Sequence, residues 1–253
     1  MANETLVLYV FGLLVFGLLI FSYRQFAYGR THSARVQKDG GSPFIGGTFL
    51  MEFVYWMFLP VGRLLVKIRV SPNFISFLCL LLSIGAGVIF AFGNFALAGW
   101  IWFLGSIMDA LDGMVARAQN TVSQAGAVID STVDRVAELA AFSGLLIYYH
   151  DNIFAMLAVL GTLMGSMLTS YITAKGDILR LKVPRGFMRR AERAVYIGAA
   201  ALFSPLLASF LEPHAIYPQY HFMIAILLLV AVVSNASVIY RVHWLCTELN
   251  KNS

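Results

Sequence analysis

Long apolar runs, each close to twenty residues, recur along this chain and constrain what it can fold into. One of them, residues 73–92, reads "NFISFLCLLLSIGAGVIFAF" and has no charged residue. A helix of about 20 apolar residues spans the hydrocarbon core of a bilayer. Only 12% of the 253 residues are charged, whereas about a quarter is usual in soluble domains. We therefore expect an all-α integral membrane protein.

Seven segments are predicted to span the membrane: 5–23, 73–92, 96–119, 122–148, 153–175, 193–211 and 220–245. Residues 49–70 differ from these, because they carry Arg63, Lys67 and Arg69 at near-helical spacing. We expect them to form an amphipathic helix in the membrane interface, broken at Pro60. The predicted organisation is thus an N-terminal spanning helix with a cytoplasmic linker (1–48), the interfacial helix (49–70) and a six-helix membrane domain (71–253).

The positive charges are distributed asymmetrically between the two sides of the membrane that these predicted spans define. All 18 Lys and Arg residues fall on the same side, whereas the connections on the other side, around "FGNFA", "YYHDNI" and "LEPHAIYPQ", have none. Positive charge stays on the cytoplasmic side of a membrane, so we expect the N-terminus outside and the C-terminus in the cytoplasm. The net charge of +5 is not accompanied by an aromatic-interleaved basic surface, so we expect no nucleic-acid partner.

Four aspartates interrupt the apolar sequence in "MDALDGMVARAQNTVSQAGAVIDSTVDRVAE", residues 108–138. Asp109 and Asp112 are three residues apart near the end of one predicted helix, and Asp130 and Asp134 are four apart near the start of the next, so each pair shares a helix face. A short turn can aim the two faces at one point. Four carboxylates remain ionised together only with cations among them, and an all-oxygen ligand set favours Mg²⁺ or Mn²⁺. We expect two such ions. Structural ion pairs with arginine, or a cation pathway, are the alternatives.

The full pattern is Asp109-x2-Asp112-Gly113-x2-Ala116-Arg117-x8-Gly126-x3-Asp130-x3-Asp134. It closely resembles the motif of the CDP-alcohol phosphotransferase family of membrane enzymes, with all eight positions present. The stretch "RVSPNFISFL" (69–78) is similar to the entry to that family's first core helix. The first 50 residues have no counterpart in the resemblance.

The resemblance implies a transferase that displaces CMP from a CDP-linked donor, CDP-diacylglycerol, by an alcohol hydroxyl, in a homodimer in a prokaryotic inner membrane. It implies that Asp109, Asp112 and Asp130 bind metal, and that Asp134 is the general base and a further metal ligand. The residues implied to bind the CDP donor are Asn73, Ser76, Asp112, Gly113, Ala116, Arg117, Ser123 and Gly126. For Asn73, Ser76 and Ser123, helix capping and turn formation are alternatives.

The stretch "TAKGDILRLKVPRGFMRRAERA", residues 173–194, is rich in cations. Most of these are expected to be topological. Lys175, Arg193 and Arg241 resemble the acceptor-phosphate residues of the subfamily that makes phosphatidylinositol phosphate or its archaeal counterpart, which implies inositol 1-phosphate as the acceptor. Clustered cations also suit a phosphorylated alcohol on chemical grounds. Glycerol 3-phosphate, free inositol, serine or a lipid-free CDP-polyol reaction remain alternatives, as does a divalent-cation carrier.

Gly161 and Gly165 form a G-x-x-x-G pattern in the fifth predicted span. Small residues at this spacing let two helices approach closely. The contact can lie between two copies of the chain or within one.

Overall fold

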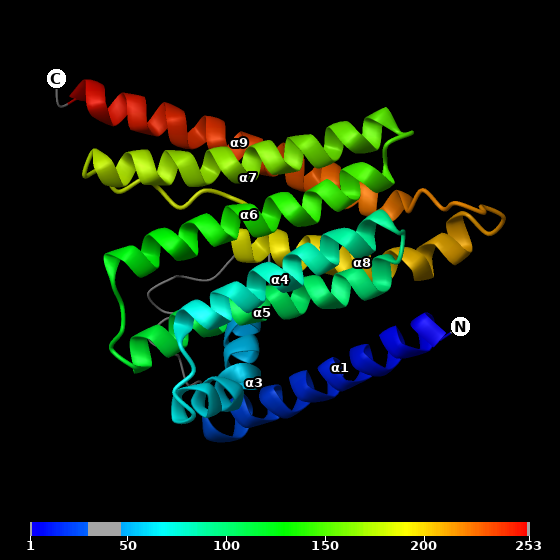
Figure 1. Cartoon of the computed structure of the whole chain (residues 1–253), viewed down its shortest axis with the longest axis horizontal. Coiled ribbons are helices and arrows are strands. Elements are labelled where there is room, and N and C mark those ends of the chain that lie inside the picture. Colours follow the sequence, from blue (N-terminus) through cyan, green and yellow to red (C-terminus); the bar gives the residue numbers. More distant parts are fainter. Residues whose placement is uncertain (1, 30–46, 252–253) are drawn as a thin grey trace. The chain divides into compact units, whose positions relative to one another are not determined.

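The computed structural model describes residues 2–29 and 47–251, and in these ranges it contains helices and no strand (Figure 1). Most of the predicted cytoplasmic linker lies outside the described residues. The helices are α1 (Ala2–Tyr28), α3 (Gly47–Lys67), α4 (Pro72–Ala91), α5 (Phe95–Ala118), α6 (Gln124–Tyr148), α7 (Ile153–Ile178), α8 (Arg190–Leu211) and α9 (His221–Lys251).

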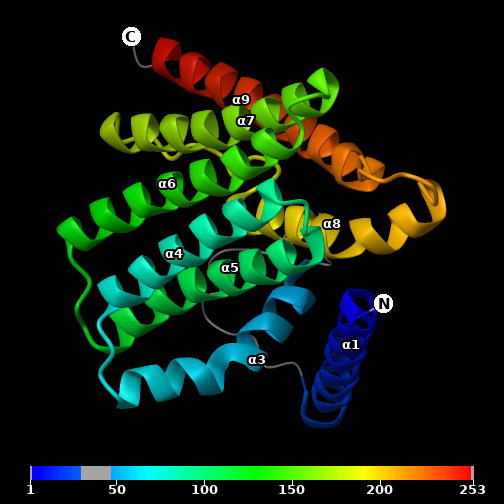
Figure 2. The ribbon, with the colours of Figure 1, turned by 45° about the vertical axis from the view of Figure 1, so that its right-hand side comes forward.

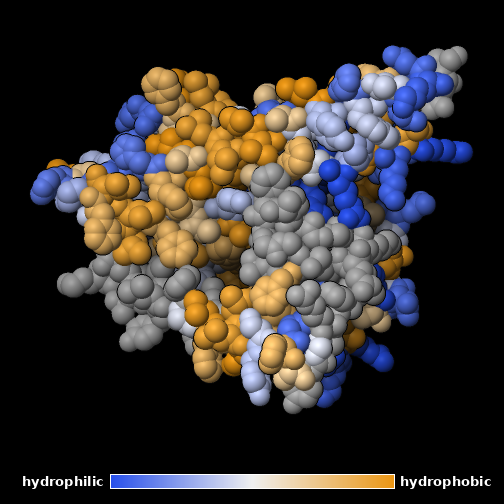
Figure 3. Space-filling view, turned by 180° about the vertical axis from the view of Figure 1, so that it is seen from behind, coloured by the Kyte–Doolittle hydropathy of each residue, from blue (hydrophilic) through white to orange (hydrophobic). Residues whose placement is uncertain are grey.

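Five of the described helices, α4, α5, α7, α8 and α9, are long and apolar enough to cross a membrane. The all-α membrane fold predicted from the sequence is confirmed. Helix α6 has 25 residues and is long enough, but its charged residues keep it out of this group. In α1, the described apolar stretch is Val15–Ala27. Figure 3 shows wide apolar areas on the visible face, as expected of a protein surrounded by lipid.

The chain divides into two compact units, one of Met1–Cys79 and Gly105–Asp130, the other of Leu80–Leu104 and Ser131–Ser253. Helices α4, α5 and α6 each run through both units without a break.

In the first unit, α1 packs on α3 through an aromatic cluster. The ring of buried Phe21 lies 5.3 Å from that of Phe49 and 5.5 Å from that of Trp56, measured between centroids. The predicted break at Pro60 is wrong, because α3 continues through this residue. Proline removes one backbone donor from a helix and usually kinks it, but the helix is retained on both sides. Further along α3, Gly62 faces the side chain of Met114 on α5.

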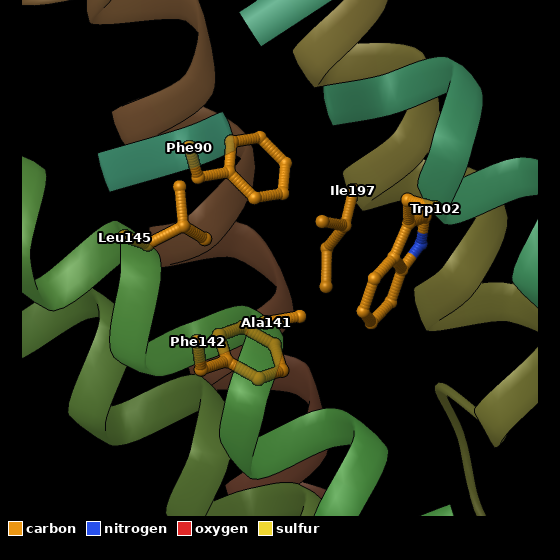
Figure 4. A pocket seen from close by; sticks show the side chains of 6 residues that line it. All are labelled: Phe90, Trp102, Ala141, Phe142, Leu145 and Ile197. Atoms are coloured by element: carbon orange, nitrogen blue, oxygen red, sulfur yellow. The ribbon is translucent and has the colours of Figure 1, made fainter. Parts of the chain in front are cut away.

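The core of the second unit is apolar and aromatic. Figure 4 shows six of its side chains facing one another across a small space, with no polar atom from them in that space: Phe90, Trp102, Ala141, Phe142, Leu145 and Ile197. The indole of Trp102 donates a hydrogen bond to the backbone oxygen of Ala194, 3.0 Å away. Gly87 and Gly144 bring α4 and α6 into backbone contact, because a Cβ on Gly144 would overlap the backbone oxygen of Gly87.

Helices α7 and α9 run side by side in the second unit (Figures 1 and 2). A Cβ on Gly165 would lie 2.6 Å from the Cβ of Ser234, and Asn235 Nδ2 donates to the backbone oxygen of Gly161 at 2.8 Å. The G-x-x-x-G pattern therefore serves a contact within one chain, the second of the two alternatives that the sequence left open.

Glu212 organises the connection between α8 and α9. It accepts hydrogen bonds from the backbone N–H of Gln219 and of His221, the latter at 3.2 Å, and its Oε1 lies 2.7 Å from His221 Nδ1. Burial opposes ionisation of this carboxyl, but the hydrogen bonds outweigh that effect and hold the pKa of Glu212 below its ordinary value.

Candidate functional site

Three of the four predicted aspartates come together in the first unit. Asp109 and Asp112 on α5 and Asp130 on α6 each offer a carboxylate oxygen, and these oxygens lie within 4.8 Å of one another. Asp112 is buried, with 6% of its surface exposed. Three carboxylates this close repel one another unless a cation lies between them. The donor set is all oxygen, and it fits a hard divalent ion such as Mg²⁺ or Mn²⁺.

Ser76 on α4 contacts one carboxylate of this cluster. Its hydroxyl donates to Asp112 Oδ2 at 2.7 Å, and the serine itself is 6% exposed. The sequence predicted that Ser76 lines a nucleotide pocket; the structure records a contact with a carboxylate, and this hydrogen bond holds Asp112 in one orientation. Asn73, one turn earlier, is exposed.

The glycines of the motif lie beside polar side chains. A Cβ on Gly113 would lie 3.2 Å from Arg117 Nη1, so the guanidinium group of Arg117 lies next to bare backbone. Ser123 Oγ accepts a hydrogen bond from the backbone N–H of Gly126 at 3.0 Å. Ser123 thus caps the N-terminus of α6, which was the alternative to a role in donor binding. Ala116 belongs to the same helix as Arg117.

Asp134 lies one helical turn after Asp130 on α6, and it belongs to the second unit. There its Oδ2 contacts Arg190 Nη1 and lies 3.7 Å from Arg135 Nη1. This pair was not predicted from the sequence, in which Arg190 was expected to be one of the topological cations. Its position three residues before Arg193, on the same face of α8, was the available signal.

Arg193 on α8 is held on two sides. Its Nη2 donates to Glu138 Oε1 on α6 at 3.1 Å and to Ser166 Oγ on α7 at 2.7 Å. Its Nη1 donates to the backbone oxygen of Met188 at 2.9 Å. Ser166 also donates to the other oxygen of Glu138. Glu138 and Ser166 were not predicted from the sequence, although Glu138 follows Asp134 at the same four-residue spacing.

Arg241 on α9 is buried, with 6% of its surface exposed. Its Nη1 donates to Thr173 Oγ1 at 3.0 Å and to the backbone oxygen of Thr169 at 3.4 Å. Within residues 2–29 and 47–251, the structure records no carboxylate that pairs with it. A buried cation without a counter-charge is costly, so this end of the second unit is suited to bind an anion.

Lys175 is exposed, and its Nζ lies 6.0 Å from the centroid of the Tyr171 ring. Thr173, which contacts Arg241, is two residues earlier on α7, so the two side chains lie about 160° apart around the helix axis. Arg193 and Arg241 thus both donate hydrogen bonds to side chains of α7. Among the described residues, the structure records no contact between Lys175 and either arginine.

Comparison with known proteins gives a consistent picture. The profile of the CDP-alcohol phosphatidyltransferase family matches residues 69–240. The archaetidylinositol phosphate synthase of Pyrococcus horikoshii is 30% identical over 145 residues, which are 57% of this chain and 76% of that protein. The phosphatidylinositol phosphate synthase of Mycobacterium tuberculosis is 34% identical over 143 residues, which are 54% of this chain and 65% of that protein.

Solved structures agree with this match. The crystal structure of the Mycobacterium tuberculosis phosphatidylinositol phosphate synthase with CDP-DAG bound superposes with a TM-score of 0.62 at 26% identity, over 73% of this chain and 90% of that one. A second structure of that synthase, in complex with manganese and citrate, has the same TM-score of 0.62, and the alignment covers 86% of it.

Proposed function

Because the chain belongs to the CDP-alcohol phosphatidyltransferase family, a family of transferases, we propose that it transfers a phosphatidyl group from CDP-diacylglycerol to the hydroxyl of a phosphorylated polyol, inositol 1-phosphate, and releases CMP. The observation that carries the proposal is the cluster of Asp109, Asp112 and Asp130, whose oxygens lie within 4.8 Å of one another. The donor is supported by the mycobacterial structure with CDP-DAG bound, and the acceptor by the names of the relatives.

The three clustered aspartates are proposed to hold two Mg²⁺ or Mn²⁺ ions; the mycobacterial synthase with manganese supports a divalent metal. A divalent ion bound there would offset the charge of the donor pyrophosphate and of the leaving CMP. Ser76 keeps Asp112 in one orientation. Arg117 lies beside the bare backbone of Gly113, a place where a donor phosphate can approach. The roles of Asn73, Ala116, Ser123 and Gly126 in donor binding remain part of the proposal.

Asp134 is proposed to accept the proton of the acceptor hydroxyl. The hydroxyl oxygen attacks the phosphorus that carries the diacylglycerol, the bond from that phosphorus to the CMP oxygen breaks, and CMP leaves. In the described structure Asp134 contacts Arg190. A general base has to be ionised before it can accept that proton.

Arg193 and Arg241 are proposed to bind the phosphate of the acceptor; a contribution of Lys175, which lies on another side of α7, is proposed from the family resemblance alone. Both arginines are buried, and the Nε of each has no hydrogen-bond acceptor in the structure. A phosphate carries close to two negative charges at neutral pH and would satisfy both groups by charge-assisted hydrogen bonds. Serine is a zwitterion and free inositol is neutral, so neither brings the net negative charge of a phosphate to the two arginines.

We further propose an inner-membrane location in a prokaryote, with the N-terminus outside and the C-terminus in the cytoplasm, and a homodimer. The organisms of the matched relatives support the first, and the charge distribution supports the orientation. Cross-linking of the purified protein in detergent tests the dimer. A monomer at every concentration would reject it.

The test of the reaction uses the purified protein in mixed micelles with CDP-diacylglycerol. Inositol 1-phosphate, glycerol 3-phosphate, inositol and serine are offered in parallel, with Mg²⁺, with Mn²⁺ and with EDTA. We expect CMP release only with metal and a phosphorylated acceptor, and an inositol-phosphate lipid by mass spectrometry. Turnover only with an uncharged acceptor would reject the phosphate site, and metal transport without CMP release would favour a carrier.

A further inference from the structure

Seven buried side-chain donors among the described residues of the second unit have no acceptor, and three of them belong to the proposed phosphate site. These three are the hydroxyl of Thr169 on α7, the Nε of Arg193 on α8 and the Nε of Arg241 on α9. The exposed fractions of these residues are 7%, 3% and 6%. Nearly all buried polar groups in proteins find a partner, so three orphaned donors in one region require an explanation.

The three residues are linked through a single face of α7. Arg241 Nη1 lies 3.4 Å from the backbone oxygen of Thr169. Arg193 Nη2 donates to Ser166, three residues before Thr169 and adjacent to it on that face. Arg241 is also within electrostatic reach of Arg193.

Thr169 differs from the other threonines of its helix. Thr162 and Thr173 donate to the backbone oxygens of Ala158 and Thr169, four residues earlier. This is the usual bond of a threonine inside a helix. The hydroxyl of Thr169 makes no such bond, so its proton is available to another acceptor.

The chemistry of the three groups points to one kind of ligand. Arginine Nε only donates, and a threonine hydroxyl can donate. A group with several acceptor oxygens and negative charge pairs with donors of both kinds, and a phosphate monoester has these properties. We propose that the Thr169 hydroxyl donates a hydrogen bond to the acceptor's phosphate, as a third donor beside Arg193 and Arg241. This inference rests on the proposed acceptor class.

The test is Thr169→Val, which removes the hydroxyl and keeps the shape. Because an unsatisfied buried hydroxyl destabilises the ligand-free protein, we expect the variant to melt a few degrees higher than the wild type, about 2 °C. The KM for inositol 1-phosphate should rise about tenfold, with kcat and the KM for CDP-diacylglycerol within about twofold of wild type. The inhibition constant of inorganic phosphate should rise by the same factor.

Matched controls separate this effect from packing. Ser204→Ala and Ser234→Ala also remove buried hydroxyls that have no partner, and they should raise the melting temperature without changing the KM for inositol 1-phosphate. Thr169→Ser keeps the hydroxyl and should keep the wild-type KM. If Thr169→Val does not fold, Thr169→Ala compared with Thr169→Ser carries the same contrast.

Binding of inorganic phosphate, measured by its effect on the melting temperature, makes the test independent of turnover. Phosphate should stabilise the wild type, and the stabilisation should shrink in Thr169→Val. Equal stabilisation of both proteins, no stabilisation of the wild type, or a KM increase without a change in phosphate inhibition would each overturn the inference. The proposed function fails by a different result, the absence of CMP release with phosphorylated acceptors.

Discussion

Arg193 on α8 and Glu138 on α6 form a buried ion pair, with Arg193 Nη2 at 3.1 Å from Glu138 Oε1. The side chains are 3% and 11% exposed, so neither charge is well hydrated. Charged pairs at this depth stay in place because each compensates the other. Glu138 therefore holds Arg193 in one orientation, and its removal leaves a buried cation with a neutral neighbour.

For Glu138→Gln we expect a loss of stability of about 3 kcal/mol, because removing one partner of a buried pair strands the other charge. Thermal unfolding in detergent measures it. Glu248→Gln, which breaks an exposed pair with Lys251, is the control and should have almost no effect. Equal melting temperatures for Glu138→Gln and the wild type would show that the pair contributes nothing.

Ser76→Ala should weaken metal binding about tenfold, because a partner that orients a metal ligand typically contributes that much to affinity. Titration with Mn²⁺, followed by electron paramagnetic resonance, measures the affinity without turnover. Ser83→Ala removes another buried serine of α4 and should bind Mn²⁺ as the wild type does. An unchanged affinity in Ser76→Ala would mean that the contact with Asp112 is irrelevant to the metal.

Asp134→Asn should lower kcat about a thousandfold, as expected for loss of a general base. Binding of CDP-diacylglycerol, measured by its stabilisation of the protein, should remain. Asp151→Asn changes an exposed aspartate in the connection between α6 and α7 and should be active. Turnover by Asp134→Asn at the wild-type rate would remove the role assigned to this residue.

The lowered pKa of Glu212 predicts a dependence of stability on pH. The ordinary pKa is 4.5 and the folded value lies below it, so the ionised carboxylate stabilises the fold above pH 4.5. That contribution is lost as the pH falls through the folded pKa. The melting temperature of the wild type should exceed that of Glu212→Gln at pH 6, and the difference should shrink in acid. A difference that is constant with pH would contradict this account.

Gly87→Ala should strongly reduce the yield of folded protein, because its Cβ would overlap the backbone oxygen of Ala140 on α6. Backbone cannot yield as a flexible side chain can. Gly85→Ala, two residues earlier on α4, has its nearest neighbour at 4.0 Å and should be tolerated. Size-exclusion chromatography in detergent measures both. A monodisperse Gly87→Ala at wild-type yield would argue against the close contact.

Much of the architecture could be predicted because it follows from local patterns. The apolar runs predicted helices, and the spacing of Asp109, Asp112 and Asp130 predicted that they share a site; the structure has their oxygens together. The spacing of Gly161 and Gly165 predicted a close contact between two helices. It could not show whether the second helix belongs to the same chain or to another copy, because glycines show only that side chains are absent. The family and the enzyme class inferred from the motif were confirmed.

The rest depends on tertiary contacts that a linear pattern does not encode. Thr169 lies in an apolar helix and reads as an ordinary threonine until the missing partner of its hydroxyl is seen. Arg190 resembled a topological cation until α8 brought it to Asp134. Pro60 indicated a break because proline disfavours the interior of a helix, but in the structure α3 continues on both sides of it.

Helix α6 carries Asp130, Asp134 and Glu138 at two successive four-residue intervals, without interruption from Gln124 to Tyr148. One inserted or deleted residue between Asp130 and Glu138 would turn everything after it by about 100°. The carboxylate of the aspartate cluster and the one that holds Arg193 would then fall out of phase on α6, although no side chain had been lost. Insertions and deletions between Asp130 and Glu138 should therefore abolish the activity of this protein, which a one-residue insertion after Asp134 tests.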